Sequence, residues 1–301
     1  MSETRARKPL AGGLEGILPR LVLAPTFVAI LVFVYGFIAW TAWISLTGSR
    51  LLPNYKFAGF AQYLTLFTRE PRWWVAILNL FIFSSLFIAF CIALGLILAV
   101  LLDQRVRAEG FFRTIYLYPM ALSFIVTGAA WKWILNPDLG LERLVRHLGF
   151  SNFTFRWLVD SKMAIYTVVL AAVWQSAGFV LALFLAGLRG IDDSIIKAAQ
   201  VDGASLPRIY WRIIIPSLRP VFLSSVIILS HIAIKSFDLV IVLTRGGPGY
   251  ATDMPATFMY AFAFNRGRLA FGAASAMVMF LAVMALIIPY LYSELKGTRN
   301  A

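Results

Sequence analysis

Three ionisable side chains, His231, Lys235 and Asp238, stand at helical spacing inside an otherwise apolar stretch of the sequence. Positions i, i+4 and i+7 share one face of a helix, so an imidazole, an ammonium and a carboxylate would lie side by side. Ionisable groups in apolar spans face a cavity or a bundle interior, because exposure to hydrocarbon is costly. The stripe therefore predicts either a polar site or a Lys235–Asp238 charge pair that neutralises itself and fixes packing.

Motifs for other kinds of chemistry are missing from the sequence. It holds no GxxxxGKS/T, GxSxG or HExxH pattern, so no nucleotide-binding, hydrolytic or zinc-protease motif is visible. His147 and His231 are too far apart to suggest one site, and Cys91 lies in an apolar run without metal-ligand spacing. We expect no catalytic residue, metal or cofactor. An intramembrane enzyme that uses His231, Lys235 and Asp238 stays the alternative from another class.

Composition places the chain in a membrane. Of its 301 residues, 60% are hydrophobic, and the mean hydropathy is +0.81. Soluble domains are nearer 45–50% apolar. The net charge of +13 is carried by short loops between apolar runs, where Lys and Arg contact lipid headgroups. We therefore expect a lipid bilayer as the surroundings and no nucleic-acid partner.

Six apolar stretches are read as membrane-spanning helices, since a span needs about 20 residues. The third reaches that length if Lys132 extends to the interface, and the fifth only by continuing through Lys235 and Asp238. The expected spans cover about 21–46, 74–102, 114–133, 163–188, 220–243 and 269–293.

The tails 1–17 and 296–301 are expected on the same side of the membrane, because the domain 18–295 between them crosses it an even number of times. The charge of the loops does not show whether this shared side is the cytoplasmic one. Lys and Arg are divided almost evenly between the two sets of loops, whereas cytoplasmic loops normally hold the excess.

The polar segment 197–220, KAAQVDGASLPRIYWRIIIPSLRP, predicts two short helices broken at Gly203. Glycine accepts the left-handed backbone angles that end a helix. Beyond the break, apolar residues recur at helical spacing, and two prolines stop or restart the chain. The residues of this second apolar face are Leu206, Ile209, Tyr210, Ile213 and Ile214.

This segment resembles the cytoplasmic coupling loop of ABC-importer permeases, which reads E-A-A-x-x-D-G-A, a hydrophobic stretch, then I-x-x-P. The residues that match are Ala198, Ala199, Asp202, Gly203, Ala204, Ile213 and Pro216, with Lys197 at the position of the acid. The resemblance implies that loop 189–219 is cytoplasmic and docks on an ATPase, and hence that both termini are cytoplasmic. Lys197 either pairs with Asp193 at i, i+4 or selects an acidic residue of the ATPase.

Further landmarks of sugar-type ABC permeases follow in the same order between about residues 20 and 295. They are Arg113, Pro119, Trp131, Asn136, Pro137, Asp138, Gly140, Trp174, Gln175, Gly178, Phe179, Ala186, Gly187, Leu188, Phe237, Asp238, Thr244, Gly246, Gly247 and Pro248. The resemblance implies an all-α permease of the bacterial inner membrane with six transmembrane helices. It also implies three kinds of partner: a second six-span permease, two cytoplasmic ABC ATPase subunits that hydrolyse ATP, and a periplasmic solute-binding protein.

The family's sugar contacts map onto two stretches of this chain. Amide and hydroxyl groups suit sugar hydroxyls, and aromatic rings suit their C–H faces, although Gln and Ser also hydrogen-bond between helices in membranes. The implied solute is a sugar, and the segment 197–204 looks most like glucose- or mannose-type permeases. A charged solute such as glycerol phosphate, with Lys235 as the counter-charge, is the alternative. The expected pathway residues are Gln175, Ser176, Phe179, Ser230, Lys235, Ser236 and Asp238.

Overall fold

The computed structural model describes residues 14–104 and 109–299, and within these ranges the chain is helical with no strands. The all-α class is thereby confirmed. Four helices are long and apolar enough to cross a membrane, namely those that include Arg20–Ser45, Pro71–Asp103, Ala164–Arg189 and Leu269–Tyr290. Two bent helix pairs pass the same test, so the described residues supply six spans if each pair counts as one.

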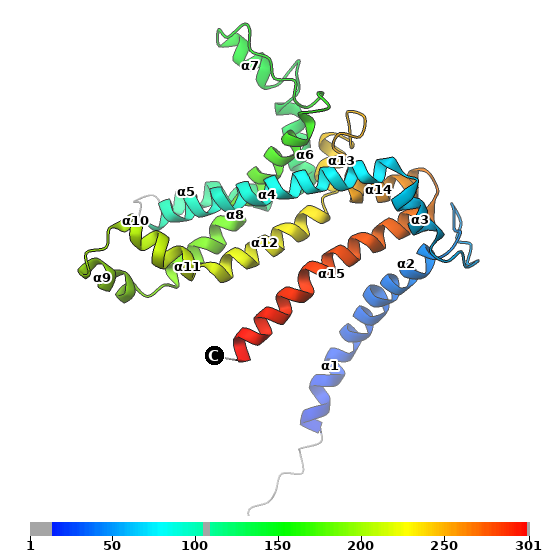
Figure 1. Cartoon of the computed structure of the whole chain (residues 1–301), viewed down its shortest axis with the longest axis horizontal. Helices are drawn as coiled ribbons and strands as arrows, with labels where there is room; N and C mark the ends of the chain where they lie inside the picture. The colour runs from blue at the N-terminus through cyan, green and yellow to red at the C-terminus, as the bar shows by residue number, and fades with distance from the viewer. Residues whose placement is uncertain (1–13, 105–108, 300–301) are drawn as a thin grey trace, which may run out of the picture.

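The N-terminal part of the first span, α1 (Leu14–Ile30), stands apart from the other helices (Figure 1). The span continues as the π-helical η1 (Leu31–Gly36) and α2 (Phe37–Ser45). No residue of its most apolar window is buried within the chain. Residues 14–17, expected in the N-terminal tail, belong to the helix, because α1 begins at Leu14. Residues 1–13 lie outside the described part.

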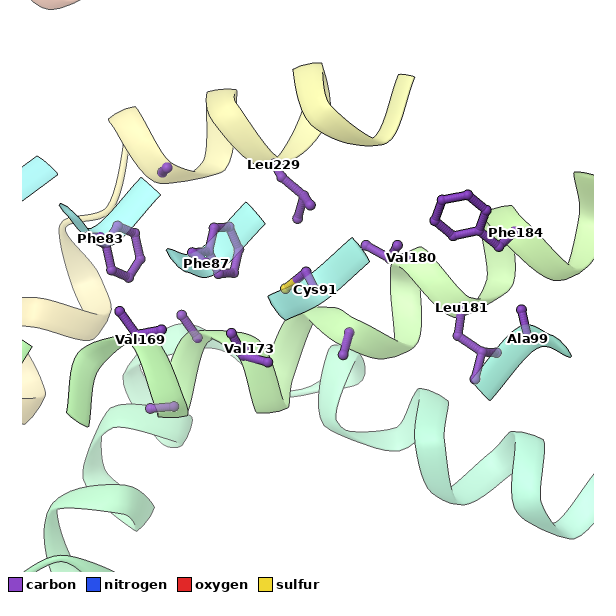
Figure 2. Packing of buried hydrophobic residues seen from close by; sticks show 14 of the residues in the cluster. Phe83, Phe87, Cys91, Ala99, Val169, Val173, Val180, Leu181, Phe184 and Leu229 are labelled. Carbon is purple, nitrogen blue, oxygen red and sulfur yellow. The ribbon is translucent and has the colours of Figure 1, made fainter. Parts of the chain in front are cut away.

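The main core forms where α4 (Pro71–Asp103) and α8 (Ala164–Arg189) run along each other beside α12 (Arg219–Ile234) (Figures 1 and 2). Gly95 permits the close approach, since a Cβ there would lie 2.6 Å from Cγ1 of Val180. Cys91 is fully buried in this core, where a free cysteine packs as a small apolar side chain. Side chains labelled in Figure 2 from the three helices include Phe83, Phe87, Val173, Phe184 and Leu229.

The third span is sharply bent, and the expectation of one continuous helix over 114–133 is wrong. Glu109–Ala121 and Phe124–Ile134 meet at 101°, with α5 (Glu109–Leu117) and the 3-10 turn η2 (Tyr118–Ala121) before the bend and α6 (Phe124–Ile134) after it. Pro119 explains the stop, because proline lacks an N–H and disfavours α-helix at the preceding residue. Ser123 restarts the helix as an N-cap that accepts from the Val126 N–H at 3.3 Å.

The fifth span is also interrupted. Leu206–Ser217 meets Arg219–Ile234 at 60°, and α12 ends at Ile234, before Lys235. The chain resumes as α13 (Asp238–Leu243). The expected continuous span 220–243 is therefore two helices. Because the break falls between Ile234 and Asp238, His231, Lys235 and Asp238 do not share one helical face.

The two ends of the bundle carry different short elements (Figure 1). At one end lie α9 (Asp193–Val201) and α10 (Leu206–Ile209). At the other end lie α3 (Ala61–Thr68) and α14 (Pro255–Tyr260), which continues as the π-helical η4 (Ala261–Asn265). Between the third and fourth spans lies a further short helix, α7 (Leu141–His147).

The last span, α15 (Leu269–Arg299), packs against the first. Ile44 of α2 joins Ala270 and Ala273 in a small buried cluster, and the Ala270 N–H donates to the Ser49 carbonyl at 3.0 Å. The helix continues through the expected tail 296–301 as far as Arg299; residues 300–301 lie outside the described part.

Candidate functional site

The predicted break at Gly203 is a helix C-cap of the Schellman type. Gly203 has φ +78°, its N–H donates to the Gln200 carbonyl at 3.0 Å, and the Ala204 N–H donates to the Ala199 carbonyl at 3.0 Å. These two bonds satisfy carbonyls that the end of α9 would otherwise leave free. Asp202 occupies the C-cap. The predicted position of this turn is therefore correct.

The start of α9 is capped by Asp192. Its carboxylate accepts from the Ser194 N–H at 2.8 Å, and this bond lowers the pKa of the Asp192 carboxyl. Lys197 is exposed on α9 and is not among the ion pairs of the described residues, so the alternative of a Lys197–Asp193 pair is not seen. Ala198 is exposed as well.

The second short helix turns its apolar side chains in two directions. Ile209 and Ile214 are buried against the bundle, whereas Leu206 is 58% exposed and Trp211 is 73% exposed. The predicted single face is therefore only partly correct, because Tyr210–Ile214 forms a π-helical turn, η3, that shifts the phase. The segment then passes through α11 (Ile215–Ser217), which contains Pro216, to the 60° bend.

Two contacts join elements at this end of the bundle. The Gln104 side chain, just past the end of α4, donates to the Tyr210 hydroxyl at 2.9 Å. At the end of α8, Arg189 pairs with Glu109 at the start of α5 at 2.5 Å. Neither contact could be predicted from local patterns, because both join residues 80 or more positions apart.

Two adjoining cavities lie where α6, α8 and α12 meet. One of about 230 Å³ is lined by His231, Lys235, Ser236 and Asp238 together with Phe83, Phe87, Phe124 and Phe237. The other, of about 240 Å³, is lined by Gln175, Ser176 and Phe179 together with Met120 and Ile228. Phe124 and Ile232 line both. Six of the seven expected pathway residues thus come together from two distant stretches.

Ser230 is the exception. Its hydroxyl donates to the Val226 carbonyl at 2.7 Å, and it is not among the residues that line either cavity.

Two buried polar atoms beside these cavities have no hydrogen-bond partner within the described residues: Gln175 Oε1 and His231 Nδ1. Gln175 is only 5% exposed, and its amide nitrogen donates to the Leu122 carbonyl at 2.7 Å. That bond fixes the amide and leaves its oxygen free to accept. Buried polar atoms are normally paired, so a ligand that donates a hydrogen bond to Gln175 Oε1 would supply the missing partner.

Lys235 and Asp238 do not form the expected charge pair; the ion pairs of residues 14–104 and 109–299 are three others. The break between α12 and α13 removes the helical register on which the expectation rested. Both side chains are exposed. Among the described residues no group of three or more His, Cys, Asp or Glu could hold a metal ion.

A buried ion pair that the sequence did not reveal lies at the end of the bundle that carries α3 and α14. Arg72 binds Asp253 through two hydrogen bonds of 2.7 and 3.2 Å, and the side chains are 13% and 1% exposed. Thr257 donates to the same carboxylate at 2.7 Å, and the Asn79 amide donates to the Asp253 carbonyl at 3.0 Å. We call these four residues the α4–α14 clamp.

Relatives of this chain are transporter permeases. It is 40% identical over 279 residues to a probable ABC transporter permease of Pyrococcus horikoshii, covering 92% of this chain and 95% of the relative. It is 37% identical over 274 residues to the xylose/arabinose import permease XacH of Haloferax volcanii, with 90% and 86% covered. The expectation of a transporter subunit rather than an enzyme is confirmed.

A solved structure shares the fold. The match is to a bacterial alginate ABC transporter in complex with an alginate pentasaccharide-bound periplasmic protein, with a TM-score of 0.80, 20% identity, and 93% of this chain and 95% of that chain covered.

The model of the family described as binding-protein-dependent transport system inner membrane component matches residues 91–295. The chain belongs to this family of inner-membrane transport components.

Proposed function

We propose that this chain is the permease subunit of an ATP-driven importer for a neutral sugar, and specifically for a monosaccharide of the glucose or mannose type. The observation that carries the proposal is the pair of cavities, which five phenylalanines line and beside which Gln175 Oε1 and His231 Nδ1 have no hydrogen-bond partner in the described ranges. Sugars present both hydroxyls and C–H faces, so they match such a lining. The related permease XacH, which imports xylose and arabinose by name, supports a sugar.

The proposed assembly contains a second six-span permease, two cytoplasmic ABC ATPases and a periplasmic solute-binding protein. The fold neighbour was solved with its solute-bound periplasmic protein, which supports the last of these. Lys197, Ala198, Ala199, Asp202, Gly203, Ala204 and Pro216 form the ATPase-coupling surface in this proposal. The exposed Val201, Leu206 and Trp211 add apolar area beside them.

In the proposed mechanism, closure of the ATPases pushes on α9 and α10, and the spans switch between outward and inward openings. Such transitions need an element that moves as a unit and a contact that transmits its motion. The Schellman turn fixes α9 relative to α10, and the Gln104–Tyr210 bond joins η3 to α4. Differential binding of ATP to the two states then drives the switch.

The topology in this proposal places loop 189–219 and both termini in the cytoplasm, and loops 50–72, 132–162 and 244–268 outside. In a Cys91→Ala background, a single cysteine at Ser205 should react with an impermeant thiol reagent only in inverted vesicles. A cysteine at Ser151 should react only in right-side-out vesicles. Both serines are exposed, so accessibility does not differ for other reasons. Reaction of both from the same face would contradict the six-span topology.

The role of the two cavities is tested by measuring sugar uptake into proteoliposomes that contain the whole complex. Gln175→Leu removes the free acceptor and should lower sugar uptake by about tenfold, since a lost hydrogen bond to a buried polar site costs roughly 1–3 kcal/mol. Trp174→Phe, on the same helix at an exposed position outside the cavity lining, is the matched control and should transport normally. Unchanged uptake by Gln175→Leu would remove these cavities from the pathway.

A glycerol-phosphate-type solute is the second candidate, and Lys235 favours it. The ammonium lines the first cavity without an ion-pair partner among the described residues. In the same uptake assay, Lys235→Met should leave transport of a neutral sugar within about twofold, because an unpaired exposed lysine contributes little to folding. Selective transport of an anionic solute that disappears in Lys235→Met would replace the sugar by a charged substrate.

A further inference from the structure

We infer that Arg50, Arg266 and Arg268 form a binding surface for the anionic headgroup of a phospholipid, at the end of the bundle that carries α3 and α14. We call these three residues the arginine cluster. The inference concerns the membrane around the protein and does not depend on the transported solute.

Backbone contacts bring the two segments of the cluster together. The Ala270 N–H donates to the carbonyl of Ser49, the residue before Arg50, at 3.0 Å. On the other side of Arg50, Leu51 lies against Gly267, with its Cδ1 3.4 Å from where a Cβ on that glycine would stand. Arg50 therefore lies beside the turn that carries Arg266 and Arg268, although they are far apart in the sequence.

Aromatic rings hold two of the guanidinium groups in place. Arg266 lies 4.4 Å from the centre of the Phe262 ring, and Arg268 lies 4.1 Å from the centre of the Phe271 ring. Both rings are 1% exposed, so they are fixed supports. A guanidinium stacked on a ring keeps its N–H donors free at the edge.

No carboxylate of the described residues pairs with the positive charges of the cluster. Arg72 also approaches the Phe262 ring, at 5.7 Å, but it is paired with Asp253. Arg50, Arg266 and Arg268 are absent from the ion pairs of the described residues. Like charges brought close together repel, so an arrangement that fixes two of them and places Arg50 beside them favours an anionic ligand.

The position of the cluster favours a lipid over a protein partner. Arg50 follows α2, which ends at Ser45, and Arg268 directly precedes the membrane-spanning part of α15, which begins at Leu269. The adjacent Leu51 and Leu52 are each 78% exposed. Basic, aromatic and aliphatic side chains mixed at the end of a span are typical of the headgroup layer.

The test uses the assembled complex in nanodiscs of phosphatidylcholine with or without phosphatidylglycerol. Native mass spectrometry counts the phosphatidylglycerol molecules that stay bound, and titration gives their apparent affinity. We expect selective retention by the wild type and an affinity lower by on the order of a hundredfold in Arg50→Gln/Arg266→Gln/Arg268→Gln, since each basic residue near an anionic surface contributes roughly fivefold. The triple Lys variant, which keeps the charge but loses the planar stacking, should fall between them.

A matched control removes three exposed cations far from the cluster, in Arg143→Gln/Arg156→Gln/Lys162→Gln, and should bind phosphatidylglycerol like the wild type. Equal retention of phosphatidylglycerol and phosphatidylcholine by the wild type would overturn the inference without any variant. So would full retention by the cluster variant. If the cluster variant keeps its lipid but loses affinity for the solute-binding protein, the surface is a protein-docking site instead.

Discussion

Gly203→Val is expected to abolish solute uptake while the permease still inserts in the membrane. Gly203 has φ +78° and no atom lies within 4 Å of where its Cβ would stand, so an added Cβ meets no clash. The cost comes from the backbone, because a β-branched residue in the left-handed region loses roughly 1–2 kcal/mol. The chain avoids that cost by opening the turn, which changes the angle between α9 and α10. ATPase activity measured with uptake should show hydrolysis without transport, or loss of the ATPase.

Two variants show whether the backbone angle is the cause. Asn tolerates left-handed angles, so Gly203→Asn should keep most of the uptake. Gly149 also has positive φ, at +104°, with no atom within 4 Å of its Cβ position, but it follows α7, away from α9. Gly149→Val should therefore leave coupling intact. Equal loss of uptake in Gly203→Asn and Gly203→Val would show that the turn tolerates no side chain for another reason.

Asp253→Leu should strongly reduce the amount of folded permease, and by more than Gly203→Val or Gln175→Leu does. It leaves the buried Arg72 guanidinium without its carboxylate and removes the acceptor of Thr257. Breaking one partner of a buried pair costs about 3–5 kcal/mol. Membrane abundance and thermal unfolding in detergent measure the effect, and Arg72→Met/Asp253→Leu should recover much of the loss.

Glu109→Gln is the control for this prediction. It breaks the Glu109–Arg189 pair, whose side chains are 29% and 46% exposed, and exposed pairs contribute only about 0.2–1 kcal/mol. Its abundance should stay close to wild type. A similar loss for Glu109→Gln and Asp253→Leu would mean that burial does not set the strength of these pairs.

Features that depend on neighbouring residues could be predicted from the sequence. Apolar length located the long helices, since hydrocarbon demands about 20 residues per span. Glycine chemistry located the Gly203 turn, because few other residues accept its angle. The helix boundaries around this turn therefore follow from local residue chemistry alone.

Features that depend on tertiary contact could not be predicted in this way. Hydropathy reports the length of a span but not its direction, so it predicts a continuous helix where the chain bends by 101° near Pro119. Helical spacing suggested a Lys235–Asp238 pair, yet the chain breaks at that point. The partners of the α4–α14 clamp, Arg72 and Asp253, are 181 residues apart, and one sequence contains nothing that pairs them.

The contact between α2 and α15 has a consequence for how the protein is made. The first span leaves the ribosome long before Ala270 and Ala273, the residues that cover Ile44, have been synthesised. During that interval the N-terminal helix stays in the bilayer without its neighbour, and the hydrogen bond from Ala270 to Ser49 can form only when the last span inserts. The contact between the first and last spans is therefore made at the final step of synthesis, and a chain that ends before residue 269 lacks the residues that cover Ile44.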